Sequence, residues 1–88
     1  MERIEEEIIV SNPHGLHARP AALLVQIANK FDSRIMLEKD GEIVDGKSII
    51  AILSLGVNSG APLKIIIEGA DAKEALEEIK EFLRRESE

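Results

Sequence analysis

The sequence contains no cysteine. This absence excludes disulfide bonds, thiolate nucleophiles and every zinc or iron–sulfur site that needs cysteine ligands. Positive charge is also scarce, since 11 Lys and Arg residues against 17 Asp and Glu residues leave a net charge of -6. We therefore expect no nucleic-acid partner, because phosphate backbones are bound through clustered Lys and Arg side chains.

Long apolar segments are absent as well. The residues from Met1 to Glu7 have neither the basic head nor the apolar run of a signal peptide. The longest uncharged stretch, Ser48 to Leu63, is interrupted by glycine, asparagine, serine and proline, which does not suit a membrane-spanning helix. These features predict a cytoplasmic protein without membrane insertion. The 88 residues allow one domain, 1–88, and 44% hydrophobic residues suffice for a core.

The first third of the chain predicts a strand and a helix. Apolar residues alternate with charged ones from Ile4 to Val10, which indicates a strand. Apolar residues then recur at helical spacing from Ala18 to Phe31. Pro20 marks the first turn of this helix, where its missing N–H costs nothing. His17 is therefore expected at or beside the N-cap.

A hairpin and a short helix are predicted in the middle of the chain. Ile35 and Leu37 share one face of a strand, and Asp40-Gly41 is the dipeptide that a tight type I′ turn prefers. Ser48 is suited to cap a short helix, Ile49 to Leu55, because its hydroxyl can accept a hydrogen bond from a free N–H group.

The last third predicts another strand and a terminal helix. Leu63 to Ile67 alternate as in a strand, and Asp71 with Glu74 forms a capping-box pattern before an amphipathic helix. The complete order is β-α-β-β-α-β-α. Because only one face of each strand is clearly apolar, we expect an α+β fold, a mainly antiparallel sheet covered by helices on one side.

One segment, Gly15 to Pro20, combines a titratable nucleophile, a cation and a helix start. Neutral imidazole attacks a phosphoryl group without a separate strong base. A helix N-terminus offers unpaired N–H groups and partial positive charge, which favour a bound anion. The planar guanidinium of Arg19 matches phosphate oxygens. These properties predict a phosphohistidine at His17 that is held while remaining transferable.

Other interpretations of these residues stay open. His17 is also compatible with a helix cap alone, as in a structural or anion-binding module. His14 and His17 have the spacing of a metal-binding pair, although two histidines without Cys or an evident third ligand fall short of a closed site. His14 suits an exposed turn. Arg19 is compatible with a solvated residue, but a cation there opposes the helix dipole and favours an anion.

The short helix predicted after Ser48 has two features of its own. A phosphate on the Ser48 hydroxyl would lie at a helix N-terminus, and the alternative is that Ser48 only caps. Ile49, Ile50 and Leu53 belong to a helix whose positions are nearly all apolar. If some of them are exposed, they indicate a docking surface for another protein; if the helix is well buried, they do not.

The residues resemble a known family at two places. The segment from Asn12 to Ala21, NPHGLHARPA, is similar to the active-site signature of HPr, the histidine-containing phosphocarrier family of the bacterial phosphoenolpyruvate-dependent sugar phosphotransferase system. The segments Lys47 to Ile50 and Ser54 to Gly56 resemble its second signature. The resemblance covers essentially the whole chain and implies an open-faced sandwich of four antiparallel strands and three helices, a single HPr-like domain.

The resemblance also implies a function. Nδ1 of His17 would accept a phosphoryl group from phosphorylated enzyme I and pass it to a sugar-specific enzyme IIA, with Arg19 helping to hold and release it. The chain would then be a carrier and not a stand-alone enzyme, with no cofactor and no metal. Partners would dock on an apolar surface that matches Ala22, Ile49, Ile50 and Leu53.

Ser48 matches a serine that, in some bacteria, a dedicated kinase phosphorylates to slow transfer and to recruit a catabolite-control transcription factor. The added dianion would repel an acidic partner. A purely regulatory role through Ser48 is a second hypothesis, although relatives that only regulate have lost the histidine at the His17 position. The runner-up to the sugar-system carrier is a paralogue with the same histidine chemistry that serves a nitrogen-regulatory or dihydroxyacetone-kinase phosphorelay.

Overall fold

Seven elements follow one another in the computed structural model, which describes residues 2–11 and 13–86. Their order confirms the predicted β-α-β-β-α-β-α. The strands are β1 (Arg3–Ile9), β2 (Arg34–Lys39), β3 (Glu42–Asp45) and β4 (Pro62–Glu68), and the helices are α1 (Ala18–Ala28), α2 (Ile49–Leu55) and α3 (Ala72–Glu86). Within the described ranges, no helix has the length and apolar character needed to cross a membrane.

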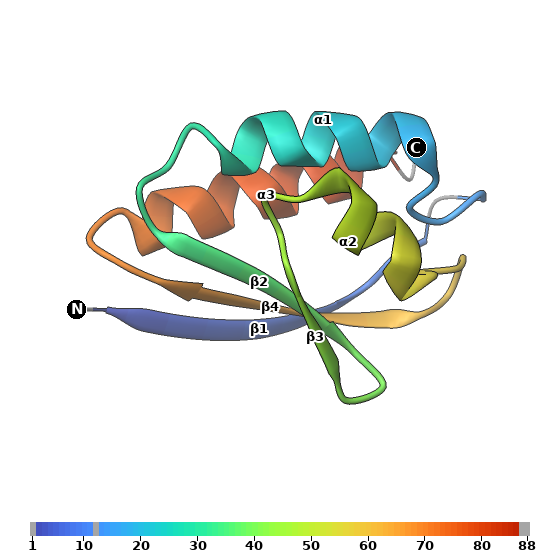
Figure 1. Cartoon of the computed structure of the whole chain (residues 1–88), viewed down its shortest axis with the longest axis horizontal. Helices are drawn as coiled ribbons and strands as arrows, with labels where there is room; N and C mark the ends of the chain where they lie inside the picture. The colour runs from blue at the N-terminus through green and yellow to red at the C-terminus, as the bar shows by residue number, and fades with distance from the viewer. Residues whose placement is uncertain (1, 12, 87–88) are drawn as a thin grey trace.

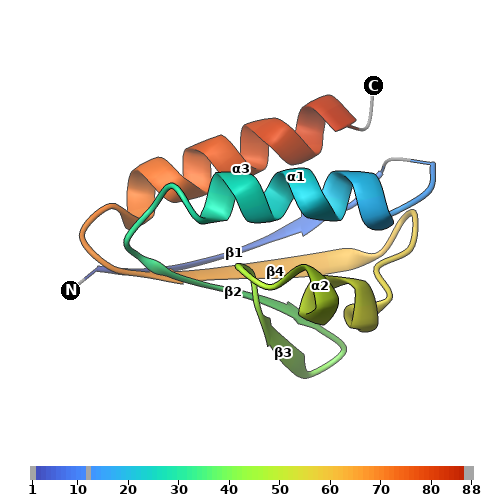
Figure 2. The ribbon, with the colours of Figure 1, turned by 45° about the horizontal axis from the view of Figure 1, so that its top comes forward.

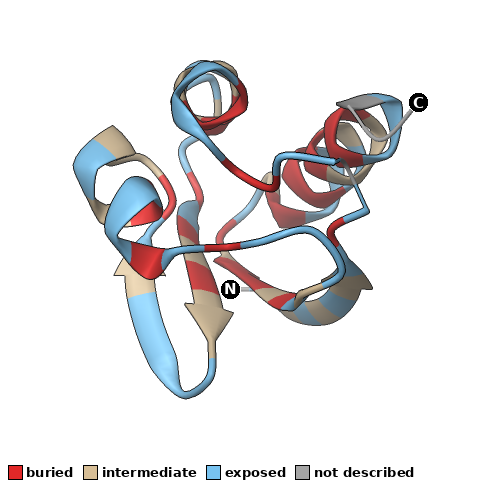
Figure 3. Ribbon diagram, turned by 90° about the vertical axis from the view of Figure 1, so that its right-hand side faces the viewer, coloured by how far each residue is buried: buried red, intermediate tan, exposed pale blue. Residues whose placement is uncertain are grey.

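The four strands form one antiparallel sheet in the order β1-β4-β2-β3. The helices cover one face of this sheet and leave the other open (Figure 1, Figure 2). Buried residues gather between the helices and the sheet (Figure 3). The predicted α+β fold, an open-faced sandwich with helices on one face, is therefore confirmed.

Strand β4 lies inside the sheet, between β1 and β2. Three of its alternate side chains are fully buried in the core: Leu63, Ile65 and Ile67. Ile66 is buried too, although alternation points it to the face away from the helices. Its partners in the neighbouring strands are Glu5 and Met36. The expectation of one apolar face per strand misses this residue, because its cover comes from strands that are distant in sequence.

Helix α1 ends three residues earlier than predicted, at Ala28 instead of Phe31. Its buried stripe consists of Pro20, Ala21, Leu24 and Ala28. Ile27 and Phe31, which the pattern assigned to this stripe, are only half-buried and pack against the edge of the core. Beyond Ala28, the N–H groups of Lys30 and Phe31 bond to carbonyl oxygens three residues back. These tighter bonds end the α-helical pattern.

A single carboxylate joins the start of α3 to the start of β2. Asp71, which the capping pattern places at a helix start, lies directly before α3 and accepts hydrogen bonds from the N–H groups of Asp32 and Ser33 at 2.9 and 3.0 Å. The buried Ser33 hydroxyl donates to it as well. This hydroxyl, followed by the Asp32 N–H, holds the pKa of Asp71 below its ordinary value of 3.8.

We expect Asp71→Asn to lower the free energy of unfolding at neutral pH, because hydrogen bonds to an ionised acceptor are stronger than those to an amide. Since the folded-state pKa of Asp71 is depressed, the wild-type advantage is fully present above the unfolded-state pKa of about 3.9. It is lost as the pH falls through the lower folded-state pKa. Urea unfolding of both proteins between about pH 2 and pH 8 measures this dependence.

Asp32→Asn is the matched control, because the Asp32 carboxylate makes no hydrogen bond or ion pair with the described residues. It should change stability little at any pH. A stability difference between wild type and Asp71→Asn that does not vary with pH would contradict this account of Asp71.

Candidate functional site

The loop before α1 is anchored to the segment that follows α2. The N–H of Leu16 donates to the Val57 carbonyl oxygen at 2.9 Å, and both side chains are buried. Gly15 has a φ of +65°, and a Cβ atom there would lie 2.2 Å from the same oxygen. Only glycine fits this close approach without a shift of the backbone. The anchor thereby holds the chain directly before His17.

His17 occupies the N-cap of α1, as the sequence predicts. Its backbone is extended, with φ of -83° and ψ of -171°, and its carbonyl oxygen accepts a hydrogen bond from the Ala21 N–H at 2.9 Å. The imidazole makes no capping hydrogen bond and is exposed. The interpretation that this side chain serves as a helix cap is therefore wrong; the ring is left free for other chemistry.

The first turn of α1 presents unpaired donors beside this imidazole. The N–H groups of Ala18 and Arg19 precede the first N–H with a helical acceptor, and Pro20 has no N–H. No acidic residue lies in this turn. The Arg19 side chain is exposed and forms no ion pair or hydrogen bond with the residues in 2–11 and 13–86. Backbone donors, helix dipole and guanidinium together favour an anion.

His14 lies in the preceding turn and contacts His17. The centroids of the two rings are 5.6 Å apart and their planes meet at 86°, an edge-to-face arrangement. The predicted exposed turn at His14 is confirmed. Among the described residues there is no group of three or more His, Cys, Asp or Glu side chains that could hold a metal ion. The ring contact itself has no signature in the sequence beyond the spacing of the two histidines.

Ser48 and α2 form a second part of the surface. Ser48 is the N-cap of α2, and its Oγ accepts a hydrogen bond from the Ala51 N–H at 3.2 Å, as predicted. On the outer side of α2, Ile50 is 75% exposed and Leu53 is 40% exposed. The alternative of a well-buried α2 is therefore wrong for these two residues. Ile49 is half-buried, and so is Ala22 in α1. Helix α1 packs against α2.

The charges of the chain are unevenly distributed over these elements. Helix α1 contains one charged residue, Arg19, and α2 contains none. Carboxylates are concentrated in β1 and α3, which together include Glu5, Glu6, Glu7, Glu74, Glu77, Glu78 and Glu81. The negative net charge of the chain, -6, therefore arises outside α1 and α2.

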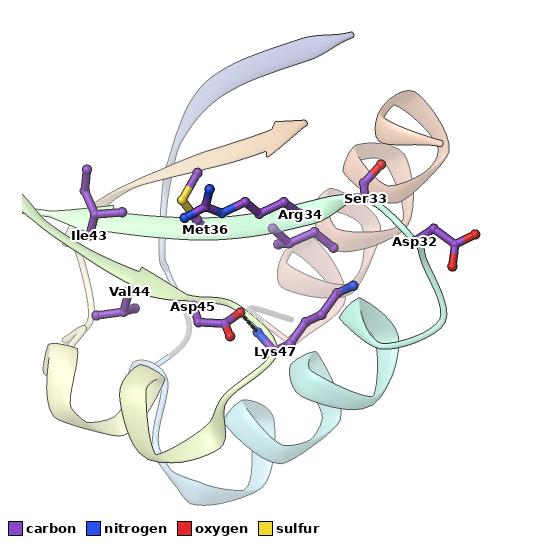
Figure 4. Close-up of a pocket in the computed structure, with 9 residues that line it drawn as sticks. Asp32, Ser33, Arg34, Met36, Ile43, Val44, Asp45 and Lys47 are labelled. Atoms are coloured by element: carbon purple, nitrogen blue, oxygen red, sulfur yellow. Dashed lines mark hydrogen bonds between the residues drawn. The ribbon is translucent and has the colours of Figure 1, made fainter. Parts of the chain in front are cut away.

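A pocket of about 370 Å³ lies along β2 and β3 (Figure 4). Neither His17 nor Ser48 lines it. Lys47 does: its backbone N–H donates to the Asp45 carboxylate at 2.9 Å, and its ammonium donates to the Phe31 carbonyl oxygen at 2.7 Å. These bonds fix the residue directly before Ser48, but the pocket itself is separate from the site.

Comparison with known proteins identifies the family. The family model PTS-HPr, described as "PTS HPr component phosphorylation site", matches residues 4–85. The chain belongs to the HPr family. HPr proteins are phosphocarrier proteins of the phosphotransferase system and not stand-alone enzymes, so this chain is an HPr-like phosphocarrier protein.

Relatives within the HPr family include carriers and proteins named Crh. The HPr-like protein Crh of Halalkalibacterium halodurans is 46% identical over 83 residues, which cover 94% of this chain and 99% of that protein. The crystal structure of the phosphocarrier protein HPr from Bacillus anthracis has a TM-score of 0.87 and 46% identity, covering 91% of this chain and 95% of that chain. HPr from Thermoanaerobacter tengcongensis reaches a TM-score of 0.92 at 45% identity, covering 96% and 94%.

We expect Gly15→Ala to destabilise the protein more than Gly56→Ala. The two glycines have nearly the same φ, +65° and +66°, but a Cβ atom at Gly56 would meet nothing within 4 Å. The left-handed conformation alone should cost about 1 kcal/mol in Gly56→Ala, and the added clash with Val57 should raise the loss to about 2–3 kcal/mol in Gly15→Ala. Urea denaturation compares the two, and equal losses would show that the Val57 anchor contributes nothing.

Proposed function

We propose that this chain carries phosphoryl groups on His17, accepting them from phosphorylated enzyme I and donating them to sugar-specific enzyme IIA domains. One observation carries the proposal: an exposed imidazole, without a hydrogen-bond partner among the described residues, stands at the start of α1, two residues before the exposed Arg19. Membership of the HPr family supports it further. The exposure of His17 allows successive partners to reach the ring.

In the proposed transfer, the lone pair of Nδ1 of His17 forms a bond to phosphorus while the bond from phosphorus to the donor breaks. The proton on the other ring nitrogen stays in place. The phosphoryl oxygens then lie at the start of α1, where the N–H groups of Ala18 and Arg19 and the Arg19 guanidinium stabilise their charge. Transfer through His17 divides one difficult reaction into two easier ones, first from the donor to His17 and then from His17 to the acceptor.

We further propose that both partners dock on the apolar patch formed by Ala22, Ile49, Ile50 and Leu53. The exposure of Ile50 and Leu53 supports this role, because large apolar side chains gathered on a surface mark protein-binding sites. The patch lies on α1 and α2, which contain no carboxylate that would repel an acidic partner.

His17→Ala and His17→Gln test the carrier role. Both variants should acquire no acid-labile phosphate from phosphoenolpyruvate and the sugar-system enzyme I. Their stability should change by less than roughly 1 kcal/mol, because no side-chain cap is lost. Phosphate incorporation is measured beside wild type, with unfolding curves as the control for folding.

Wild-type protein should be phosphorylated by the sugar-system enzyme I and not by the donors of a nitrogen-regulatory or dihydroxyacetone-kinase phosphorelay. Phosphorylation by either of those donors alone would replace the leading assignment with the paralogue. A His17→Gln protein that still incorporates phosphate would rule out His17 as the acceptor.

A second function, catabolite regulation through Ser48, is favoured by the relatives named Crh. One of them, from Bacillus subtilis, is described as a catabolite repression containing protein. We propose that an ATP-dependent serine kinase/phosphorylase modifies Ser48 and that the phosphorylated form binds a catabolite-control transcription factor. The dianion would also slow transfer from enzyme I, because it adds negative charge beside Ile49 and Ile50, where an acidic partner docks.

Ser48→Ala should abolish phosphorylation by such a kinase and should cost about 1 kcal/mol of stability, because the bond from the Ala51 N–H is lost. Ser54→Ala is the matched control: Ser54 is an exposed serine of the same helix whose hydroxyl donates to the Ala51 carbonyl oxygen. Kinase labelling with ATP distinguishes the two variants. Undiminished labelling of Ser48→Ala would remove the regulatory proposal.

A further inference from the structure

Within the described part of the chain, the imidazole of His17 makes a ring contact that could orient it. Within the described residues its side chain has no hydrogen bond and no ion pair. The contact is the edge-to-face arrangement with the His14 ring at 5.6 Å between centroids. Histidines that act in chemistry usually have their ring fixed by a hydrogen bond from the second nitrogen to a carboxylate or a carbonyl oxygen. Among the described residues, the ring in contact with His17 is instead that of His14.

His14 is well placed to act in this way because the backbone after it is fixed. Gly15 follows in the left-handed conformation that its approach to Val57 requires, and Leu16 is tied to Val57 by its N–H. His17 in turn is fixed by the extended N-cap backbone of α1. The two rings therefore project from a short segment whose backbone is fixed after His14, and edge-to-face pairing is a favoured geometry for such rings.

We propose that His14 is a positioning residue, whose ring holds the His17 imidazole in the orientation from which Nδ1 meets the phosphoryl group. This inference rests on the proposed carrier function of His17. It assigns the role to the ring of His14 and not to its N–H groups. The bond-forming step is unchanged; what His14 supplies is a restriction on the rotation of the His17 ring before the donor arrives.

Two variants separate the ring from its hydrogen-bonding groups. His14→Phe keeps an aromatic ring and removes the N–H donor, whereas His14→Gln keeps an N–H donor and removes the ring. We expect His14→Phe to transfer phosphoryl groups from enzyme I at close to the wild-type rate. We expect His14→Gln to lower kcat by about 2- to 10-fold, the loss of one aromatic pair, with KM unchanged because the docking patch is untouched.

A second measurement tests the contact without any phosphoryl transfer. In the unphosphorylated protein, the proton resonances of the His17 ring should shift in His14→Gln, because the ring current of His14 is gone, and should stay near their wild-type positions in His14→Phe. If wild-type protein accepts no phosphate but these shifts appear, the carrier function fails while the ring contact stands.

Three outcomes would overturn the positioning role. The first is an equal transfer rate in wild type, His14→Phe and His14→Gln. The second is a lower transfer rate in His14→Phe with the wild-type rate in His14→Gln, which would assign the effect to the N–H donor. The third is the absence of any change in the His17 ring resonances of His14→Gln. Unfolding curves of both variants confirm that the compared proteins are folded.

Discussion

The hydrogen bond from the Leu16 N–H to the Val57 carbonyl oxygen is the constraint on which the site depends. It joins the loop before α1 to the segment after α2, and it does so with two buried side chains, so the junction is shielded from water. Gly15 permits the approach and His17 begins the helix directly after it. The exposed imidazole of His17 therefore directly follows a backbone segment that a buried hydrogen bond holds in place.

The distribution of charge explains how a chain with a net charge of -6 can favour an anion at the start of α1. The chain carries a net charge of -6, yet the two helices beside His17 contain a single charged residue, Arg19. Many of the carboxylates lie on β1 and α3, where some form ion pairs such as that of Lys80 with Glu6, at 2.7 Å. Local charge, and not the total, decides what can bind at the start of α1.

Most of the fold and the centre of the site could be predicted from local patterns. Alternation and helical spacing, together with turn and capping signals, predicted all seven elements. Pro20 placed His17 at the start of α1, and the capping preference of serine placed Ser48 at the start of α2. The bond between Leu16 and Val57 and the partners of the Asp71 carboxylate could not be predicted. These contacts join segments far apart in the chain, and the groups that meet Leu16 and Asp71 are ordinary backbone or hydroxyl groups with no pattern of their own.

The central claim is that the start of α1 holds a phosphoryl group bonded to His17. It is tested most directly by comparing the backbone amide NMR spectrum before and after phosphorylation with phosphoenolpyruvate and enzyme I. The account predicts the largest amide shifts at Ala18 and Arg19, the free donors of the first turn, with little change at Ile65 in the core. An acid-labile phosphate that leaves the Ala18 and Arg19 amides unshifted would contradict it.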